Sequence, residues 1–311
     1  MEQKLPSGNW KGKRMRQGID SGNFWTKSST GFSYQSGLIE CAAEPVAADN
    51  RIVYEDRFYS VGECRDAVET DKTESDNMFL QMLPAVGQAI VARKLKPDQE
   101  LELGVGTPLK RYGMEAPKYK DYFMGRKFDF RWNGNPYSIE ITRVEVYPQG
   151  YAAYLANYDK FSGYKELNVI DIGGGTVDAF MISGGMPITS SFVSLNRGVI
   201  NLTNKCRDDL EPIGVNISEN QICSSVMELE NLHLKAELID RICRLQRDQY
   251  IKDLLYRLRE RGFDFSVPTL FIGGGAMLLS KFWERYQINT VGCLDETANA
   301  RAYEALLDRV M

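Results

Sequence analysis

The sequence predicts an α/β protein with two related lobes, each with a mixed sheet flanked by helices, and a cleft between them. Two turns lead to this prediction, Asp20-Ser21-Gly22 and Asp171-Ile172-Gly173-Gly174-Gly175, because each joins two strands through an aspartate and glycine. The chain has 311 residues, more than the length at which one hydrophobic core usually keeps growing. Two domains are therefore expected, each with one of the turns.

The chain begins with a basic segment. Within residues 1–17, five basic residues against one acidic residue give a net charge of +4; they are Lys4, Lys11, Lys13, Arg14 and Arg16 against Glu2. We expect residues 1–13 to form a basic tail, which is either solvated or in contact with an acidic partner or a neighbouring subunit.

The first lobe is predicted to span residues 14–164 and to open with a hairpin over residues 14–36. At the hairpin tip, Asp20 is followed by Ser21, Gly22 and Asn23, and Lys27 stands on the return strand, where its ammonium can neutralise phosphate charge. An Asp-x-Gly turn alone is common. The turn at Asp20 is informative here because a similar turn follows at Asp171.

The rest of the first lobe is assigned from local patterns. A small inserted subdomain is expected at about residues 37–75, with strands at 51–54 and 58–62, followed by a helix over 77–94 capped by Ser75-Asp76. A strand at 101–105 precedes a hairpin of 128–132 with 137–141 across Asn133-Gly134-Asn135. The strand at 143–147 leads to Gln149, which lies between a strand and a helix and is either a water-orienting amide or a plain capping residue.

The second lobe, residues 165–311, carries the more informative turn. Asp171 to Asp178 lies between apolar segments at 168–170 and 179–182, and its Gly173, Gly174, Gly175 and Thr176 form a loop almost bare of side chains. Such a loop lets N–H groups approach an anion closely. Phosphate beside Asp171 requires a divalent cation between the two, so the loop predicts Mg²⁺ held through water. The alternative is a tight glycine hairpin without a ligand.

Helices and a third glycine turn complete the second lobe. A helical subdomain is expected at about residues 196–262, with Leu229 and Leu232 at the start of an apolar stripe and Gly262 as a stop. The strand at 269–272 runs into Gly273, Gly274 and Gly275 and then into a helix, a seat for part of a nucleotide. A final helix is expected over about residues 296–310.

Composition limits the function classes. The net charge of −4 offers no broad field for DNA, and neither a signal peptide nor a membrane-spanning run is found, so the protein is expected in the cytoplasm, away from membranes. Six scattered cysteines without a Cys-x-x-Cys pair argue for reduced thiols and against zinc. The single histidine, His233, is interpreted as an ordinary helical residue.

Taken in order, these motifs resemble those of the actin, Hsp70 and sugar-kinase superfamily, and most closely the bacterial ParM-type plasmid-segregation actins. The resemblance extends to Tyr59-Ser60-Val61-Gly62-Glu63, to Gly106-Thr107-Pro108 with Tyr112, and to 146–153, and it covers roughly residues 15 to 308. Residues 15–19 depart from it, because the corresponding family strand is largely apolar, which leaves the length of this strand open.

The resemblance implies an actin-like fold with Mg²⁺ and ATP, or GTP, in the cleft. The phosphates would lie between the hairpins of Asp20 and Asp171, which would also hold the metal, and Gly273, Gly274 and Gly275 would lie against the adenosine. Gln149 would orient the attacking water, with Asp171 assisting, and the final helix would pack back toward the first lobe.

Three function classes compete. The first is an ATPase that assembles into a helical homopolymer on binding Mg-ATP and disassembles after hydrolysis; for this class the resemblance implies plasmid segregation, with a DNA-binding adaptor protein at the filament ends and no direct contact with nucleic acid. The second is a small-molecule kinase of the sugar-kinase type. The third is a noncatalytic nucleotide-binding adaptor or chaperone-like module. The resemblance in the first half of the chain favours the filament.

Overall fold

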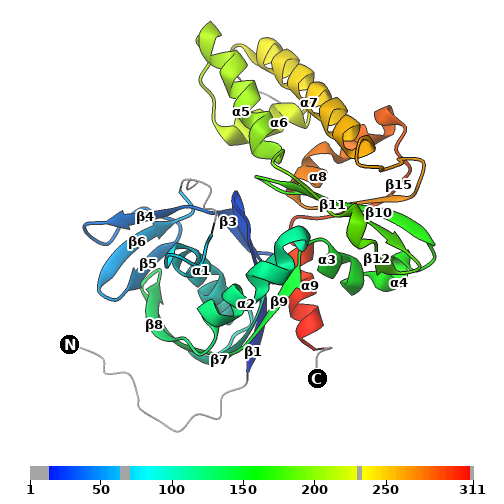
Figure 1. Cartoon of the computed structure of the whole chain (residues 1–311). Coiled ribbons are helices and arrows are strands. Elements are labelled where there is room, and N and C mark those ends of the chain that lie inside the picture. The colour runs from blue at the N-terminus through cyan, green and yellow to red at the C-terminus, as the bar shows by residue number, and fades with distance from the viewer. Residues whose placement is uncertain (1–13, 64–70, 230–232, 309–311) are drawn as a thin grey trace.

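The computed structural model describes residues 14–63, 71–229 and 233–308, which fold into two lobes (Figure 1). In this part of the chain, the first lobe contains a sheet of nine strands in the order β3-β2-β1-β7-β9-β8-β5-β6-β4. Its strands are β1 (Met15–Ser21), β2 (Trp25–Ser28), β3 (Ser33–Gln35), β4 (Leu38–Cys41), β5 (Arg51–Tyr54), β6 (Arg57–Val61), β7 (Asp98–Thr107), β8 (Lys127–Trp132) and β9 (Asn135–Pro148). The expected basic tail, residues 1–13, lies outside the described residues.

The second lobe contains a sheet in the order β12-β11-β10-β14-β15, with β13 beside β11. Its strands are β10 (Glu166–Ile172), β11 (Val177–Ser183), β12 (Met186–Pro187), β13 (Val193–Leu195), β14 (Thr269–Ile272) and β15 (Thr290–Leu294). In each sheet, the first strand of a glycine-turn hairpin also pairs in parallel with another strand. Strand β1 of the β1–β2 hairpin pairs with β7, and β10 of the β10–β11 hairpin pairs with β14. The predicted two-lobed α/β fold with mixed sheets is confirmed.

Strand β1, whose length the polar sequence left open, spans Met15–Ser21. Gln17 lies in its middle and is fully buried, and its Nε2 donates to Ser28 Oγ at 3.0 Å and to the Ala85 carbonyl at 2.8 Å. A buried amide nitrogen is tolerated when its N–H groups are hydrogen-bonded, as both are here. The strand therefore continues unbroken from Met15 to Ser21 and delivers Asp20 to the hairpin tip.

Strands β4, β5 and β6, from the segment expected as an inserted subdomain, extend the first sheet, because β5 pairs with β8. Helix α1 (Asn77–Ala92) covers this sheet, but its expected cap is partly wrong. Ser75 Oγ accepts from the Asn77 N–H at 3.3 Å, whereas Asp76 makes no cap bond and pairs with Arg126 at 2.9 Å. The β8–β9 hairpin turns at Asn133 and Gly134, both with positive φ, as the sequence predicted.

The remaining helices of the two lobes are mostly short. They are η1 (Leu109–Arg111), α2 (Tyr112–Phe123), α3 (Tyr151–Ala156), α4 (Tyr158–Phe161), η2 (Thr189–Ser191), α5 (Val199–Leu210), η3 (Glu211–Ile213), α6 (Glu219–Val226), α7 (Ala236–Arg259), α8 (Gly274–Leu279), η4 (Ser280–Tyr286) and α9 (Ala298–Leu307). No helix among the described residues is long and apolar enough to cross a membrane.

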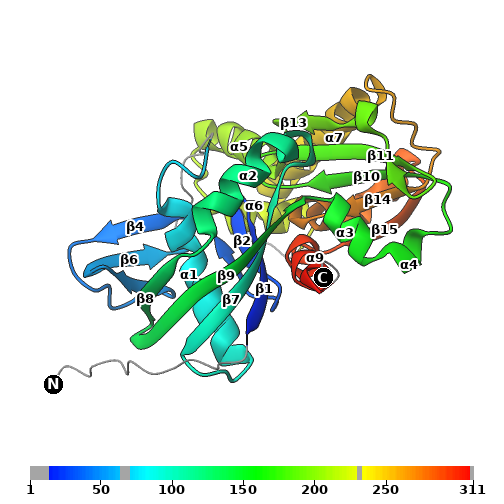
Figure 2. The ribbon, with the colours of Figure 1, turned by 60° about the horizontal axis from the view of Figure 1, so that its bottom comes forward.

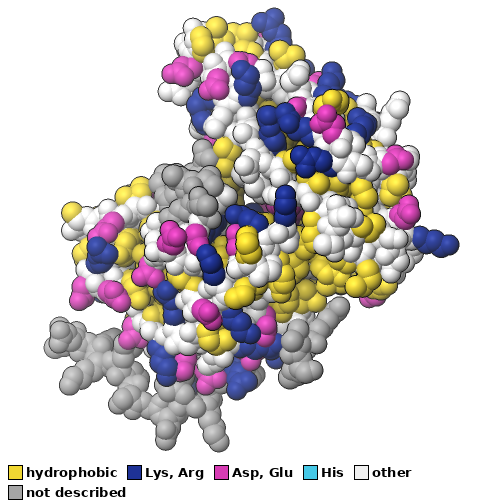
Figure 3. Space-filling model, in the orientation of Figure 1, with side chains coloured by type: hydrophobic (Ala, Val, Ile, Leu, Met, Phe, Trp, Pro, Cys, Tyr) yellow, Lys and Arg dark blue, Asp and Glu magenta, His cyan; other side chains and the backbone are white. Residues whose placement is uncertain are grey.

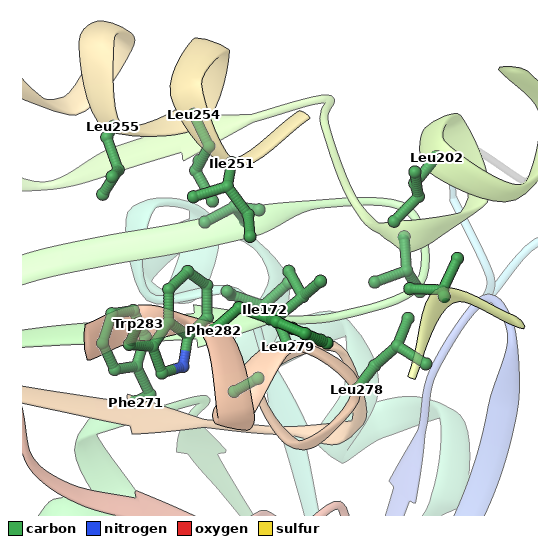
Figure 4. Packing of buried hydrophobic residues seen from close by; sticks show 14 of the residues in the cluster. Ile172, Leu202, Ile251, Leu254, Leu255, Phe271, Leu278, Leu279, Phe282 and Trp283 are labelled. Carbon is green, nitrogen blue, oxygen red and sulfur yellow. The ribbon is translucent and has the colours of Figure 1, made fainter. Parts of the chain in front are cut away.

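Helix α7 begins later than the apolar periodicity suggested. Leu229 is exposed in the connection before it, Leu232 lies outside the described residues, and His233 precedes the helix. The buried side chains of α7 share a hydrophobic core with Phe271 and Trp283, whose rings stack with centroids 4.2 Å apart (Figure 4). The cysteines in the described residues, Cys41, Cys206, Cys223, Cys243 and Cys293, are free thiols.

Helix α9 packs against the first sheet although it follows the second lobe in sequence (Figure 2). Three glycines make room for it: a Cβ on Gly18 would lie 1.9 Å from the Ala300 carbonyl oxygen, and Cβ atoms on Gly104 and Gly106 would meet Tyr303 at 2.9 and 2.0 Å. Alanines on the other side of α9 share a core with α3, β10 and β14. Residues of α3 and α4 belong to the same core and pack against the second sheet, although they precede residue 165, where the second lobe was expected to start.

Because the neighbour of Gly18 is backbone, Gly18→Ala is expected to destabilise the protein by about 1–3 kcal/mol, since α9 has to move away from β1. Thermal and denaturant unfolding measure the effect. Gly113→Ala is the control, because no atom lies within 4 Å of a Cβ at this helical position and alanine should be neutral or slightly stabilising there. Equal stability of Gly18→Ala and wild type would contradict the packing of α9 on β1.

Candidate functional site

A cavity of about 500 Å³ lies where the two lobes meet, within the size range of small-molecule sites. In the space-filling view, Lys and Arg side chains gather along the notch between the lobes (Figure 3). The structure brings every site residue predicted from sequence to this cavity: Asp20, Ser21, Gly22, Asn23, Lys27, Gln149, Asp171, Gly173, Gly174, Gly175, Thr176, Gly273, Gly274 and Gly275.

The β1–β2 turn supplies a buried carboxylate with two partners. Asp20 is only 4% exposed; its Oδ2 accepts from Lys27 Nζ at 3.3 Å and its Oδ1 accepts from Gln149 Nε2 at 3.0 Å. The antiparallel register places Asp20 directly opposite Lys27. A Cβ at Gly22 would lie 2.8 Å from the Trp25 carbonyl oxygen, so the turn needs glycine. The arrangement presents an acid, an ammonium and an amide to the same space.

The β10–β11 turn is held by the start of α5. The carbonyl oxygens of Gly173, Gly174 and Gly175 accept hydrogen bonds from the N–H groups of Val199, Ile200 and Gly198 at 3.0–3.1 Å. The carbonyls of the loop are thus engaged with α5. The Gly173 N–H donates to the Thr176 carbonyl at 2.9 Å, so the N–H groups of Gly174 and Gly175 are the ones suited to an anion. A Cβ at Gly174 would lie 2.3 Å from Phe24 Cβ, so the two glycine turns are in contact across the lobes.

Asp171 lies at the base of this loop and is 8% exposed. Burial raises its pKa to about 7, and the nearby charges of Asp20 and Asp178 act in the same direction, against a hydrogen bond from Asn299 that lowers it. That bond joins Asn299 Nδ2 to Asp171 Oδ2 at 2.7 Å. A carboxylate in such a position favours a compensating cation.

Two buried polar atoms at the cavity have no hydrogen-bond partner within the described part of the chain, Ser21 Oγ and Asp178 Oδ1. Buried polar atoms are rarely left unsatisfied unless a water, an ion or a ligand serves them. The hydroxyl suits a phosphate oxygen and the carboxylate oxygen suits a hydrated cation. The polar end of the cavity therefore fits a phosphate group with its metal.

The site fits a hydrated Mg²⁺ better than a fully protein-bound metal. Among the described residues, no group of three or more His, Cys, Asp or Glu side chains could hold a metal ion. Mg²⁺ usually keeps several waters and binds through one or two carboxylates together with substrate phosphates. Asp20 and Asp171 match that pattern.

The cavity also has apolar lining residues. Val199, Cys223, Met227, Met277 and Leu278 line it, next to the third glycine turn. In that turn Gly273 has φ of 95°, and a Cβ there would lie 2.7 Å from Asp171 Oδ1. Glycine therefore lets the backbone pass close to the carboxylate, and the apolar surface beyond it suits a flat base.

Three further residues at the cavity were not predicted from the sequence. Lys72 Nζ donates to the Ser21 carbonyl at 2.7 Å, and Arg111 pairs with Glu115 at 3.1 Å while its charge acts on Asp178. Asn299 contacts Asp171 from the start of α9. None of the three stands in a glycine turn, and only tertiary folding brings them to the site.

The cavity between the two lobes is lined by both Asp-Gly hairpins, one from each lobe. Residues 18–151 match the family model of the actin like proteins N terminal domain. No curated protein gives a sequence match.

Solved structures extend the likeness over nearly the whole chain. The archaeal actin homolog Ta0583 is 20% identical with a TM-score of 0.74, covering 95% of this chain and 99% of that chain, and has also been solved with ADP. Bacillus thuringiensis ParM with ATP is 13% identical (TM-score 0.69), and a 15-stranded ParM filament from Clostridium botulinum is 18% identical (TM-score 0.72); each covers 95% of this chain and 99% of the other. The predicted resemblance to ParM-type actins and the actin-like fold are confirmed.

Proposed function

We propose that this protein is an actin-like ATPase that assembles into a helical homopolymer on binding Mg-ATP and disassembles after hydrolysis. The observation that carries the proposal is the cavity lined by both Asp-Gly hairpins, one from each lobe. A phosphate chain between the hairpins would contact both lobes at once, so that binding favours one relative position of the lobes. The ADP complex, the ATP complex and the filament among the similar structures support the same proposal.

The roles of the binding residues follow from their positions. Lys27 and the N–H groups of the two glycine loops, with Ser21, Asn23 and Thr176, would bind phosphate oxygens, and Asp20 and Asp171 would hold the metal through water. When bound, Mg²⁺ would neutralise charge that develops on the transferred phosphoryl group. Gly273, Gly274 and Gly275 would lie against the nucleoside.

Gln149 is proposed to orient the attacking water. Strand β9 ends at Pro148 and α3 begins at Tyr151, so Gln149 lies on the turn that faces Asp20. Its Nε2 donates to Asp20, and its Oε1 is the acceptor that a water needs. Asp171, on the opposite hairpin, would help polarise the water.

Gln149→Ala should therefore bind ATP as the wild type does but hydrolyse it at least roughly tenfold more slowly, equivalent to about 1.4 kcal/mol in the barrier. Phosphate release at saturating Mg-ATP and the Kd of a slowly hydrolysed analogue measure the two effects. Filaments of the variant should persist longer. Wild-type turnover by the variant would remove Gln149 from the mechanism.

One comparison tests the proposed function against its alternatives. The purified protein is sedimented with Mg-ATP, and ADP release is measured across a panel of sugars. Pelleting that depends on Mg-ATP supports the filament, whereas ADP release that depends on one sugar supports the kinase. Nucleotide binding with neither response supports the noncatalytic adaptor. Repeating the sedimentation with GTP decides between the two nucleotides.

We further propose a cytoplasmic role in plasmid segregation, with a DNA-binding adaptor protein at the filament ends. The similarity to ParM structures supports this role, and the net charge of −4 is consistent with indirect contact to DNA. The purified protein should then leave the mobility of duplex DNA unchanged at physiological salt. A shift of DNA by the protein alone would contradict the need for an adaptor.

A further inference from the structure

In the described residues, the chain passes between the lobes twice, after β9 and again between β15 and α9 (Figure 2). At the first crossing, the Gln149 N–H donates to the Thr107 carbonyl at 2.9 Å, which ties the turn to the first sheet. At the second, Asn299 lies in the first turn of α9 and is 5% exposed. Asn299 connects the two crossings to each other.

The side-chain amide of Asn299 makes two different bonds. Its Oδ1 accepts from the Gly150 N–H at 2.9 Å, and its Nδ2 donates to Asp171 Oδ2 at 2.7 Å. The orientation of the amide follows from Gly150, because a backbone N–H can only donate; Oδ1 therefore faces Gly150, and Nδ2 is left to donate to Asp171. The planar amide of Asn299 thus bridges Gly150, the residue after Gln149, and the Asp171 carboxylate, and it fixes the distance between them.

Helix α9 also contacts the strand that leads to Asp20. The Ala300 carbonyl lies so close to Gly18 that no Cβ fits between them, and Gly18 precedes Asp20 by two residues on β1. On the outer side of the helix, Arg93 Nη2 bonds to Glu304 at 2.7 Å. The start of α9 is therefore in contact with all three motifs of the polar end of the cavity.

We propose that Asn299 is a positioning residue that holds the Asp171 carboxylate in register with the Gln149 turn and transmits movement of α9 to the metal side of the site. This inference rests on the proposed function, since Asp171 and Gln149 take their roles from it. Asn299 contacts two residues of the site and acts through them. Any rotation of the first sheet that carries α9 along would move the donor that orients Asp171.

Two variants separate the halves of this contact. Asn299→Ala removes both bonds. Asn299→Asp keeps the shape and an acceptor for the Gly150 N–H but replaces the donor to Asp171 with a second carboxylate. Both should lower kcat at least about tenfold, as loss of a residue that orients a metal ligand commonly does. A role limited to the Gly150 turn would leave Asn299→Asp close to wild type.

A binding readout accompanies the kinetics. The melting temperature with ADP is followed as Mg²⁺ is added, and Asn299→Ala should need at least about tenfold more Mg²⁺ for half of the shift. Glu304→Gln is the control on the same helix, because it weakens the pair with Arg93 away from the cavity; its kcat and Mg²⁺ requirement should stay within about twofold of wild type.

The outcomes distinguish this inference from the proposed function. A wild type whose melting temperature does not respond to ADP with Mg²⁺ and which does not hydrolyse ATP overturns both. A responsive wild type together with unchanged Asn299 variants overturns the inference alone. A normal Asn299→Asp overturns the link to Asp171, and a Glu304→Gln variant as impaired as Asn299→Ala reduces Asn299 to a packing residue. If Asn299→Ala does not fold, the isosteric Asn299→Asp decides.

Discussion

Asp171→Ala is expected to lose most of the rise in melting temperature that ATP with Mg²⁺ gives to the wild-type protein. A ligand that binds only the folded state stabilises it by about 2.7 kcal/mol when its concentration is 100 times the Kd. Asp171 is one of the two carboxylates proposed to hold the metal, and it lies beside the glycine loop proposed to bind phosphate. Without it the metal loses one of its two protein anchors, and the repulsion between phosphate and Asp20 is less well neutralised.

The empty variant should melt close to the wild type. Burial raises the pKa of Asp171, so the ionised carboxylate is disfavoured in the protein without ligand. Its removal relieves this cost, which offsets the loss of the acceptor for Asn299 Nδ2. Thermal melts with ATP, with ATP and Mg²⁺, and with an added chelator separate the contributions of nucleotide and metal. Asp159→Ala, at an exposed aspartate of α4, is the control. An unchanged shift in Asp171→Ala would mean that the metal site is elsewhere.

The hairpin tips could be predicted from sequence because their geometry is local. An aspartate, a glycine and a return strand decide that Asp20 faces Lys27 across two paired strands, whatever the rest of the chain does. The same holds for the β10–β11 turn, where the register sets Asp171 opposite Asp178. That both tips reach one cavity could be predicted only through the resemblance, since no local pattern specifies how two lobes face each other.

Periodicity was less reliable at helix boundaries. Leu229 and Leu232 fit the spacing of an apolar stripe, but Glu228, just after α6, has a positive φ of 57°. The chain therefore turns there and does not continue as a helix. A backbone turn of this kind leaves no signal in hydrophobic spacing. The cap of α1 was assigned partly to Asp76, whose carboxylate instead meets Arg126, a residue 50 positions away.

Asn299 shows what sequence reasoning cannot reach. Its two partners lie 149 and 128 positions away, and an asparagine at the start of a helix is by itself an ordinary residue. The glycines that admit α9 carry a weak signal, because glycine within a strand can mark a close backbone approach. The approaching element itself is known only from the fold.

Addition of Mg-ATP to the purified chain at micromolar concentration is expected to raise light scattering and to move the protein into the pellet, with reversal as ATP is consumed. Phe24, at the tip of the first hairpin, packs into the hydrophobic core of the second lobe and touches Gly174, so the relative position of the lobes is set where phosphate would bind. Nucleotide is therefore placed to select the lobe arrangement whose outer surfaces match. Assembly should show a critical concentration, because each added subunit loses translational freedom that only several simultaneous contacts offset.

Asp20→Ala tests whether the cleft controls this assembly. Asp20 is 4% exposed, and within the described residues its carboxylate bonds to Lys27 and Gln149 of the site, so the substitution removes no outer surface on which a second subunit could dock. A higher critical concentration in this variant would therefore have to act through nucleotide binding and lobe position. Asp159→Ala, which changes an exposed carboxylate, shows how much a surface charge alone contributes. If the wild type stays monomeric with ATP, GTP and their slowly hydrolysed analogues over a wide range of salt, the filament proposal fails, and the kinase or adaptor takes its place.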